Sequence, residues 1–239
     1  MNNSKTPVLI TGASQGIGRA IALSFAEKTD RPLILLARNT KNLEKSASMC
    51  MKAGVKSCFI ISADATNSSE MASLRLPDGC DAPGIIINNA GSFLLKSLSD
   101  TTPEEFMHQI NVNLFAAVNT TSRFLPDLRK MESALIINIC SVGALSGLKD
   151  SGAYSASKHA VLGYTRSLRK ELMGTNIAVS AINLGQTHST SWDGSSVNPG
   201  SLIDPFDVGS LLVAISSLST RSVVEEVLIQ PLHGKVPPM

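Results

Sequence analysis

The sequence has no apolar run long enough to cross a membrane. Runs such as residues 33–37 and 84–87 stop far short of the roughly 20 residues that a membrane-spanning helix needs. The opening residues, MNNSKTPVLITG, also lack the charged region, apolar block and small-residue cleavage site of a secretion signal. We therefore expect a protein of the cytoplasm with no membrane partner.

An excess of charge of either sign is absent as well. The chain has 21 basic and 19 acidic residues, which gives a formal net charge of +2. Because the two signs are interspersed, no polybasic face is available for a phosphodiester backbone, and no acidic tail is present. Nucleic acid is therefore not expected as a partner.

Cysteine and histidine are few and lack the spacing of metal ligands. No C-x-x-C pair occurs, and no histidine pair lies beside a cysteine. We expect no metal site and no disulfide, and we interpret the cysteines as reduced, mostly buried thiols. The residues are Cys50, Cys58, Cys80 and Cys140, with His108, His159, His188 and His233.

Short apolar runs that alternate with helical patterns make up most of the chain. Hydrophobic residues account for 43% of 239 residues, enough for the core of one large domain spanning residues 1–239. Strands that are apolar on both faces and alternate with helices predict a doubly wound, Rossmann-type parallel sheet of seven strands, with helices on both faces. The predicted strands are 8–11, 33–37, 57–62, 84–88, 134–140, 176–182 and 226–229. The predicted helices are 19–28, 43–53, 102–128, 151–173 and 205–218.

A glycine-rich turn connects the first strand to the first helix. Gly12, Gly16 and Gly18 leave room for a dinucleotide pyrophosphate to approach the backbone, and the helix N-terminus contributes free N–H groups. The alternative is a tight turn that only packs the helix against the sheet. Its place in the first strand–helix unit favours cofactor binding.

The end of the second strand bears on the choice between NADP and NAD. NAD sites usually place a carboxylate there, on the ribose 2′-hydroxyl, whereas this chain has Arg38 and Asn39. Arg38 can pair with a 2′-phosphate, with Arg19 as a second cation. We therefore expect NADP(H) as the preferred cofactor. If Arg38 is only a surface arginine at a helix start, the preference is loose and NAD(H) is used too.

Tyr154 and Lys158 are four residues apart in a predicted helix, so their side chains share one face. An ammonium close to a phenol favours the phenolate and lowers the tyrosine pKa. Ser141, at the end of a predicted strand, can place a hydroxyl beside the phenol. By itself this spacing favours a solvated pair on a helix surface, and the functional interpretation needs support from the rest of the chain.

One segment, residues 189–204, interrupts the alternation of strands and helices. It begins STSWDGSSVNPGS and contains Trp192, the only tryptophan of the chain. A stretch of this kind in a compact domain is either a lid over a site or a disordered insert. Because it follows a strand end, where doubly wound sheets bind ligands, we favour a short substrate lid.

Together these motifs resemble the short-chain dehydrogenase/reductase family, in its classical branch, over nearly the whole chain. The matching segments are residues 11–18 (TGASQGIG), Asp64, residues 88–91 (NNAG), Asn113, Ser141 and residues 154–158 (YSASK). The family implies that Tyr154 is the general acid and base, that Ser141 holds the substrate oxygen, that Lys158 lowers the tyrosine pKa and binds the nicotinamide ribose, and that Asn113 completes a proton relay. It implies cofactor contacts from Gly12, Ser14, Gln15, Gly16, Ile17, Gly18, Arg38, Asp64, Ala65, Asn89, Ala90, Gly91, Tyr154, Lys158, Gly185, Thr187 and Ser189.

Purely structural roles remain open for several of these residues. Asn113 can bond a neighbouring carbonyl, Asp64 can cap the following helix, and Asn88 and Asn89 can serve the turn as well as the cofactor. After the sixth strand Leu184 stands where the family usually has proline, so that turn is expected to be less rigid. His188 can face the substrate from this turn, but we favour a solvent-facing loop residue.

The resemblance implies an NADP(H)-dependent oxidoreductase that interconverts a small carbonyl and an alcohol. The C-terminus and short lid look most like carbonyl- and sepiapterin-reductase-like members, with Trp192 and Leu148 as candidate apolar walls. The alternatives are a 3-oxoacyl-thioester (acyl-carrier-protein) reductase and a non-catalytic protein that senses NADPH. We also expect a homodimer or homotetramer, because helices 102–128 and 151–173 carry apolar residues on more than one face. Those residues are Leu114, Phe115, Val118, Val161 and Leu168.

Overall fold

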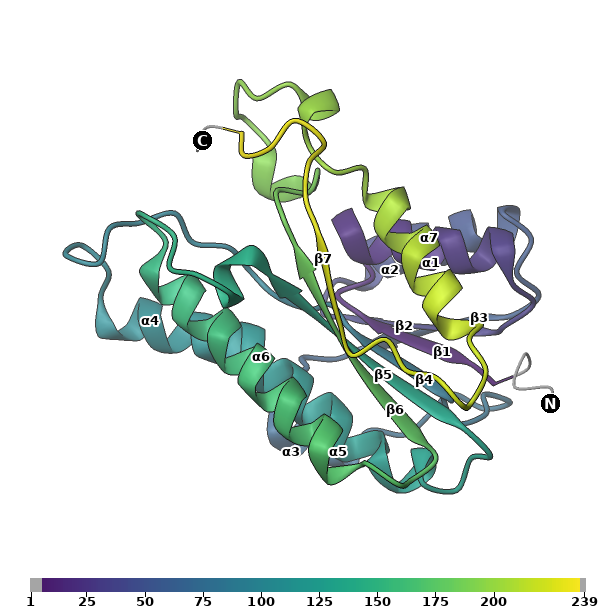
Figure 1. Ribbon diagram of the computed structural model, residues 1–239. Helices are drawn as coiled ribbons and strands as arrows, with labels where there is room; N and C mark the ends of the chain where they lie inside the picture. Colours follow the sequence, from purple (N-terminus) through teal and green to yellow (C-terminus); the bar gives the residue numbers. More distant parts are fainter. Residues whose placement is uncertain (1–5, 237–239) are drawn as a thin grey trace.

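The computed structural model describes residues 6–236, which form a three-layer α/β structure around one sheet (Figure 1). All strand pairs are parallel and the strand order is β3-β2-β1-β4-β5-β6-β7. The strands are β1 (Val8–Thr11), β2 (Leu33–Ala37), β3 (Cys58–Ser62), β4 (Ile85–Asn88), β5 (Ala134–Ser141), β6 (Ile177–Leu184) and β7 (Glu226–Ile229). The predicted seven-stranded Rossmann-type sheet is confirmed, with strand ends within two residues of those expected.

Helices cover both faces of the sheet because consecutive strand residues point to opposite sides. In β1, Val8 and Ile10 pack with α1, α2 and α7, whereas Leu9 packs in a second cluster with α3, α5 and α6. Figure 1 shows α4 extending beyond that second layer. The helices are α1 (Gly16–Lys28), α2 (Thr40–Lys52), α3 (Ser68–Ser73), α4 (Pro103–Ile110), α5 (Ala116–Leu128), α6 (Gly152–Glu171) and α7 (Pro205–Ser216).

Two elements differ from the prediction. The expected helix 102–128 is interrupted by a π-helical turn at Asn111–Phe115, which separates α4 from α5. Single π turns occur often at functional sites, and this one carries Asn113. The six-residue α3 was not predicted, because its sequence SSEMAS is too short and polar to show a helical period.

The segment proposed as a lid, residues 189–204, is fixed at both ends. The backbone N–H of His188 donates to Ile203, and the N–H of Ile203 donates to Gln186, each at 2.9 Å. Between these ends lie two short 3₁₀ turns, η4 (Thr190–Trp192) and η5 (Pro199–Ser201). The segment is thus a closed loop over the end of the sheet, beside the C-terminal segment in Figure 1.

The apolar residues proposed for subunit contacts divide into two groups. Val161 and Leu168 are 2% and 7% exposed, so these two were wrongly assigned to the surface: α6 buries them against the sheet. Phe115 is 42% exposed, and Leu114 and Val118 are half-buried. Within residues 6–236, none of the helices has the length and apolar character to cross a bilayer.

Candidate active site

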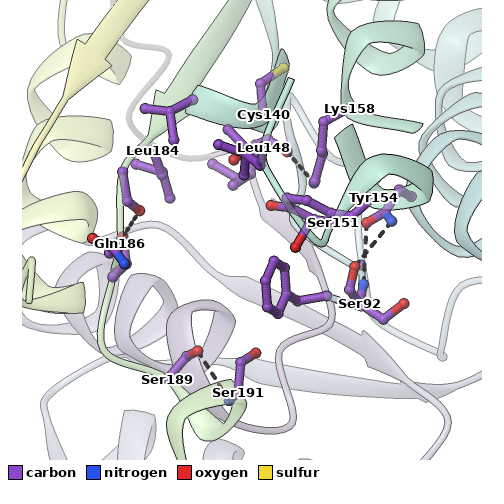
Figure 2. A pocket seen from close by; sticks show the side chains of 18 of the residues that line it. Ser92, Cys140, Leu148, Ser151, Tyr154, Lys158, Leu184, Gln186, Ser189 and Ser191 are labelled. Carbon is purple, nitrogen blue, oxygen red and sulfur yellow. Dashed lines mark hydrogen bonds between the residues drawn. The ribbon is translucent and has the colours of Figure 1, made fainter. Parts of the chain in front are cut away.

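A cavity of about 470 Å³ lies at the carboxyl ends of the central strands (Figure 2). The strand order reverses between β1 and β4, and parallel sheets bind ligands at such a reversal. Figure 2 shows Gln186, Ser189 and Ser191 on one side of the cavity and Ser92, Tyr154 and Lys158 on the other. The predicted site residues that line it are Ile17, Asn89, Gly91, Asn113, Ser141, Tyr154, Lys158, Gly185, Thr187 and Ser189.

The glycine-rich turn after β1 has little tolerance for side chains at its glycines. Gly12 and Gly16 have φ of +66° and +53°, which side chains with a Cβ seldom adopt. A Cβ on Gly18 would lie 2.3 Å from the carbonyl oxygen of Gly12 and 2.6 Å from Nδ2 of Asn89. Glycine is therefore required sterically at Gly18 and conformationally at Gly12 and Gly16.

The N-terminus of α1 is open to an anion. Its N-cap residue Gln15 makes no capping hydrogen bond through its side chain, and its first turn contains no acidic residue. The free N–H groups and positive end of the helix dipole are suited to a phosphate. A glycine-rich turn that leads into an uncapped helix N-terminus therefore fits the binding of a dinucleotide pyrophosphate at the start of α1.

Asn89 ties the turn after β4 to the turn after β1. Its Nδ2 donates to the carbonyl oxygen of Thr11 at 3.0 Å, and the backbone N–H groups of Asn89 and Ala90 both donate to Thr11 Oγ1 at 3.0 Å. Asn88 is buried and donates to Thr121 and Asn138. Asn88 is thus structural, whereas Asn89 both holds the turns together and lines the cavity.

Arg38 and Asp64 follow β2 and β3, beside the glycine-rich turn. The Arg38 side chain is 72% exposed, and its Nη1 lies 3.9 Å from Asp64 Oδ2. Asp64 accepts hydrogen bonds from the backbone N–H and hydroxyl of Thr66. The suggestion that Asp64 caps α3 is wrong, because Asn67 is the N-cap and accepts from the N–H groups of the first turn.

Arg19 does not extend toward the cavity. Its Nε donates to Ser46 Oγ at 2.8 Å, and its Nη2 donates to the carbonyl oxygen of Ser14. Arg38 is therefore the freer cation of the two. The remaining predicted cofactor residues are not among those that line the cavity; these are Gly12, Ser14, Gln15, Gly16, Gly18, Arg38, Asp64, Ala65 and Ala90.

Tyr154 and Lys158 both face the cavity from α6, as their spacing predicted. Lys158 is buried, and its Nζ donates to the carbonyl oxygen of Ile139 at 3.0 Å. Burial lowers the pKa of Lys158, since the charged form loses its hydration. The rings of Tyr154 and Phe93 pack edge to face, with centroids 4.9 Å apart at 79°, which restricts the orientation of the tyrosine ring.

The pKa of Tyr154 lies above its ordinary value in this structure, and the lowering expected from Lys158 stays a prediction. Burial raises the pKa of Tyr154 to about 12, and a hydrogen bond with Ser141 offsets only part of that effect. Desolvation of the buried phenol is the largest cause of the shift. The Lys158 ammonium lies 5.9 Å from the ring centre and donates to the Ile139 carbonyl.

Ser141 and Asn113 complete the polar cluster. Ser141 is buried at the end of β5, where its Oγ accepts from the N–H of Gly143 at 3.0 Å. Asn113 lies within hydrogen-bond distance of Ser92, Gln109 and Ser157, at 3.0 to 3.2 Å. Its amide is thus locked in place by three segments of the chain.

The turn after β6 forms the opposite wall. Thr187 is buried, and Ser189 accepts from the N–H of Ser191 at the start of the lid. Trp192 lines the cavity and donates its Nε1–H to the carbonyl oxygen of Thr187 at 3.1 Å. His188 is exposed and is not among the lining residues, as expected. Leu148 lines the cavity too, so both candidate apolar walls are in place.

Several lining residues were missed by sequence reasoning. Phe93 follows the NNAG segment by two positions, so its proximity to the site was available from the motif. Gln186 pairs with the backbone of Val236, with its Nε2 donating at 2.8 Å and its Oε1 accepting at 2.6 Å. This pairing brings Lys235, near the C-terminus, to the cavity, and no local pattern signals it.

Comparison with known proteins agrees with this geometry. The family model described as short chain dehydrogenase matches residues 6–198. An uncharacterized oxidoreductase of Staphylococcus aureus (strain MW2) is 29% identical over 229 residues, covering 94% of this chain and 96% of the relative.

Two solved structures show the same fold. An alcohol dehydrogenase from the archaeon Thermococcus sibiricus, complexed with 5-hydroxy-NADP, superposes with a TM-score of 0.88 at 24% identity, covering 98% of this chain and 100% of that one. A metagenomic short-chain oxidoreductase in complex with NADP has a TM-score of 0.79 at 27% identity, covering 95% and 96%. With its fold, its motifs and the family match in agreement, this chain belongs to the short chain dehydrogenase family and is an oxidoreductase.

Proposed function

We propose that this protein transfers hydride between NADP(H) and a small carbonyl or alcohol substrate, with Tyr154 as the group that gives or takes the proton. The observation that carries the proposal is the convergence of Tyr154, Ser141 and Lys158 on one cavity that continues to the glycine-rich turn. A pure binding protein has no use for a proton donor held in this way.

The Tyr154 phenol is suited to the acid role. A pKa of about 12 keeps the hydroxyl protonated at neutral pH, so it is ready to donate to a carbonyl oxygen that gains negative charge. Ser141, hydrogen-bonded to Tyr154, is placed to hold that same oxygen. Phe93 restricts the direction from which the phenol approaches.

Lys158 and Asn113 stand behind Tyr154. The buried ammonium of Lys158 is the positive charge of the cluster, and we assign it to the ribose hydroxyls of the cofactor. Asn113, anchored to Ser92, Gln109 and Ser157, is assigned to the replacement of the proton on Tyr154 through water. These assignments follow the family motif, position by position.

The cofactor is assigned to the glycine-rich turn and the strand ends around it. When bound, a nicotinamide dinucleotide supplies the hydride. Gly12, Gly16 and Gly18 would hold the pyrophosphate against the start of α1, and Arg38 would hold a 2′-phosphate. Support for NADP comes from the exposed guanidinium of Arg38 and from the bound NADP of the metagenomic oxidoreductase.

Tyr154→Phe tests the proposal. Removal of the hydroxyl should lower turnover by about 10² to 10⁴-fold, the range for a general acid, and leave NADP⁺ affinity within about twofold. Tyr164→Phe is the matched control, since Tyr164 is the other tyrosine and packs in the core cluster beneath α5 and α6. NADPH oxidation is first screened across ketones, aldehydes, quinones, pteridines and 3-oxoacyl thioesters.

The screen also separates the alternatives. Exclusive turnover of 3-oxoacyl thioesters would assign the chain to that reductase class. Tight NADPH binding without oxidation by any carbonyl, or equal rates for Tyr154→Phe and Tyr164→Phe, would contradict the proposed chemistry. If replacement of Arg38 leaves the affinity for NADP⁺ unchanged, that result would contradict only the proposed preference for NADP over NAD.

We further propose that the protein works as a homo-oligomer of the cytoplasm. Oligomerisation is supported by Met107 on α4 and Phe115 on the following π turn, whose side chains are 54% and 42% exposed. Apolar side chains exposed on adjacent turns favour a subunit contact. Cytoplasmic location follows from the sequence argument above and stays a prediction.

A further inference from the structure

The charged residues that line the cavity all carry the same sign. They are Lys149, Lys158 and Lys235, and no aspartate or glutamate lines it among the described residues. The chain as a whole has 21 basic and 19 acidic residues, so the cavity departs from the overall balance. Lys158 is already assigned to the reaction, which leaves two cations without a role.

Lys149 and Lys235 make no ion pair within residues 6–236. Elsewhere charges are paired: Lys96 lies 2.8 Å from Glu105, and Arg166 lies 2.6 Å from Glu226. Both cavity lysines are exposed, so their ammonium groups are hydrated and free to take a new partner.

The backbone that carries Lys149 is fixed on both sides. The N–H of Leu148 donates to Ser155 Oγ at 3.1 Å, and the carbonyl oxygen of Asp150 accepts from the N–H of Lys96 at 2.6 Å. Asp150 has a φ of 55°, a left-handed conformation that persists only where the surroundings enforce it. Lys149 therefore stands at a defined place on the rim.

That place is on the rim, beside the wall that Leu148 forms next to Tyr154. The side chain of Leu148 and the ring of Tyr154 meet over Gly143, where a Cβ would lie 3.2 Å from Leu148 Cδ1 and 3.3 Å from Tyr154 Cε1. Lys149 is the next residue along from Leu148. It is thus placed for the substrate, away from the turn that would hold the pyrophosphate.

Lys235 is brought to the cavity by a specific contact. The side-chain amide of Gln186 makes two hydrogen bonds with the backbone of Val236, which fastens the C-terminal segment to the turn after β6. Two hydrogen bonds on the backbone of one residue fix its orientation as well as its position. The lysine is therefore held at the wall formed by Gln186 and Gln230.

We propose that the substrate carries an anionic group, a carboxylate, at the end away from its carbonyl, and that Lys149 and Lys235 bind that group at the cavity rim. The substrate class is then a small oxo acid and the corresponding hydroxy acid. Lysine is a mobile point charge and accepts a carboxylate in several orientations. This inference rests on the proposed carbonyl chemistry and adds the substrate class to it.

A pair of probes that share a ketone and differ in charge tests the anion site. The carboxylate 4-oxopentanoate and its methyl ester share the same ketone and carbon chain. We expect kcat/KM with NADPH to favour the carboxylate, and Lys149→Ala with Lys235→Ala to reduce that preference about tenfold, or about 1.4 kcal/mol. Raising the salt from about 20 mM to about 300 mM should reduce it as well, since exposed charges are screened.

The control variant combines Lys52→Ala with Lys56→Ala, which removes two exposed lysines at the end of α2 and before β3, at the opposite end of the sheet. It should keep the wild-type preference. Quenching of Trp192 fluorescence, measured with saturating NADP⁺, gives the affinity for each probe independently of turnover.

The outcomes separate the two proposals. Reduction of both probes at equal kcat/KM in wild type and double variant would overturn the anion site and leave the carbonyl chemistry intact. Preferential binding of the carboxylate without any turnover would support the anion site and contradict the carbonyl chemistry for this class. A fall in NADP⁺ affinity in the double variant would assign the two lysines to the cofactor and overturn the inference.

Discussion

The ammonium nitrogen of Lys158 lies 5.9 Å from the centre of the Tyr154 ring and donates its hydrogen bond to the carbonyl oxygen of Ile139. The two side chains share one face of α6, yet the charge is directed at the end of β5. Burial is the largest influence on the phenol and raises the pKa of Tyr154 to about 12. The cluster is thus organised around a protonated tyrosine.

The two directions of the reaction should differ in their dependence on pH. With a Tyr154 pKa of about 12, the protonated form dominates from about pH 6 to about pH 9, so carbonyl reduction should be nearly independent of pH there. Alcohol oxidation needs the deprotonated form, whose population rises about tenfold per pH unit below the pKa. We expect the oxidation rate to rise accordingly.

Initial rates in both directions, measured at constant ionic strength, check this prediction. A plateau of the oxidation rate near neutral pH would show that Tyr154 loses its proton much more easily in the working enzyme than burial alone allows. That result would support the expectation that Lys158 lowers the tyrosine pKa.

Removal of the guanidinium of Arg38 should weaken NADP⁺ and spare NAD⁺. The side chain is 72% exposed, so Arg38→Gln should not disturb the core. Charge-assisted hydrogen bonds contribute about 1.5–3 kcal/mol, which corresponds to a loss of NADP⁺ affinity of roughly ten- to hundredfold. Dissociation constants for the two cofactors give the answer.

Arg75→Gln is the matched control for this experiment, because Arg75 is also exposed and follows α3, outside the residues that line the cavity. It should change neither affinity. Equal weakening of both cofactors by Arg38→Gln would show that Arg38 does not contact a 2′-phosphate.

Much of this architecture was readable from the sequence because its causes are local. Strands that are apolar on both faces, such as residues 33–37, are stable only in a sheet that helices cover on both sides. The spacing of Tyr154 and Lys158 places both side chains on one face of a helix. The spacing does not say which acceptor Lys158 will find, since Ile139 belongs to another element. The local sequence pattern thus predicted which residues form the site but not the hydrogen-bond partner of Lys158 or the pKa of Tyr154.

Long-range contacts account for most of what the sequence did not predict. Gln186 and Val236 are joined across 50 positions, and Lys235 reaches the cavity only through that contact. The same limit applies to Val161 and Leu168, whose helix shows apolar residues on several sides. Only the packed structure shows that Val161 and Leu168 are both buried against the sheet.

Gly18→Ala should damage the cofactor cradle and the fold together. The added Cβ would lie 2.3 Å from the carbonyl oxygen of Gly12, so backbone must move, and overpacking of this kind costs about 1–3 kcal/mol. Unfolding in urea and NADP⁺ titration should both register the change. We expect a lower free energy of unfolding and weaker cofactor binding.

Gly163→Ala provides the opposite case within α6. A Cβ there meets no atom within 4 Å, and alanine is favoured over glycine in a helix by about 1 kcal/mol. This variant should gain stability and bind NADP⁺ as the wild type does. A Gly18→Ala protein with normal stability and affinity would show that the turn is not a tight cradle.

Phe115→Asp should dissociate the proposed oligomer without unfolding the subunit. Phe115 is 42% exposed on the π turn between α4 and α5, so a carboxylate there stays hydrated in a monomer and loses its hydration in a subunit contact. Replacement of a central aromatic contact residue costs about 2 kcal/mol or more of subunit binding free energy.

Met51→Asp is the control variant. Met51 lies on α2 in the other helix layer and is 48% exposed, so this variant introduces the same charge away from the proposed contact. Sedimentation at micromolar concentration should show an oligomer for the wild type and Met51→Asp and a monomer for Phe115→Asp. A wild-type monomer would refute the subunit contact, and an oligomeric Phe115→Asp would move it to another face.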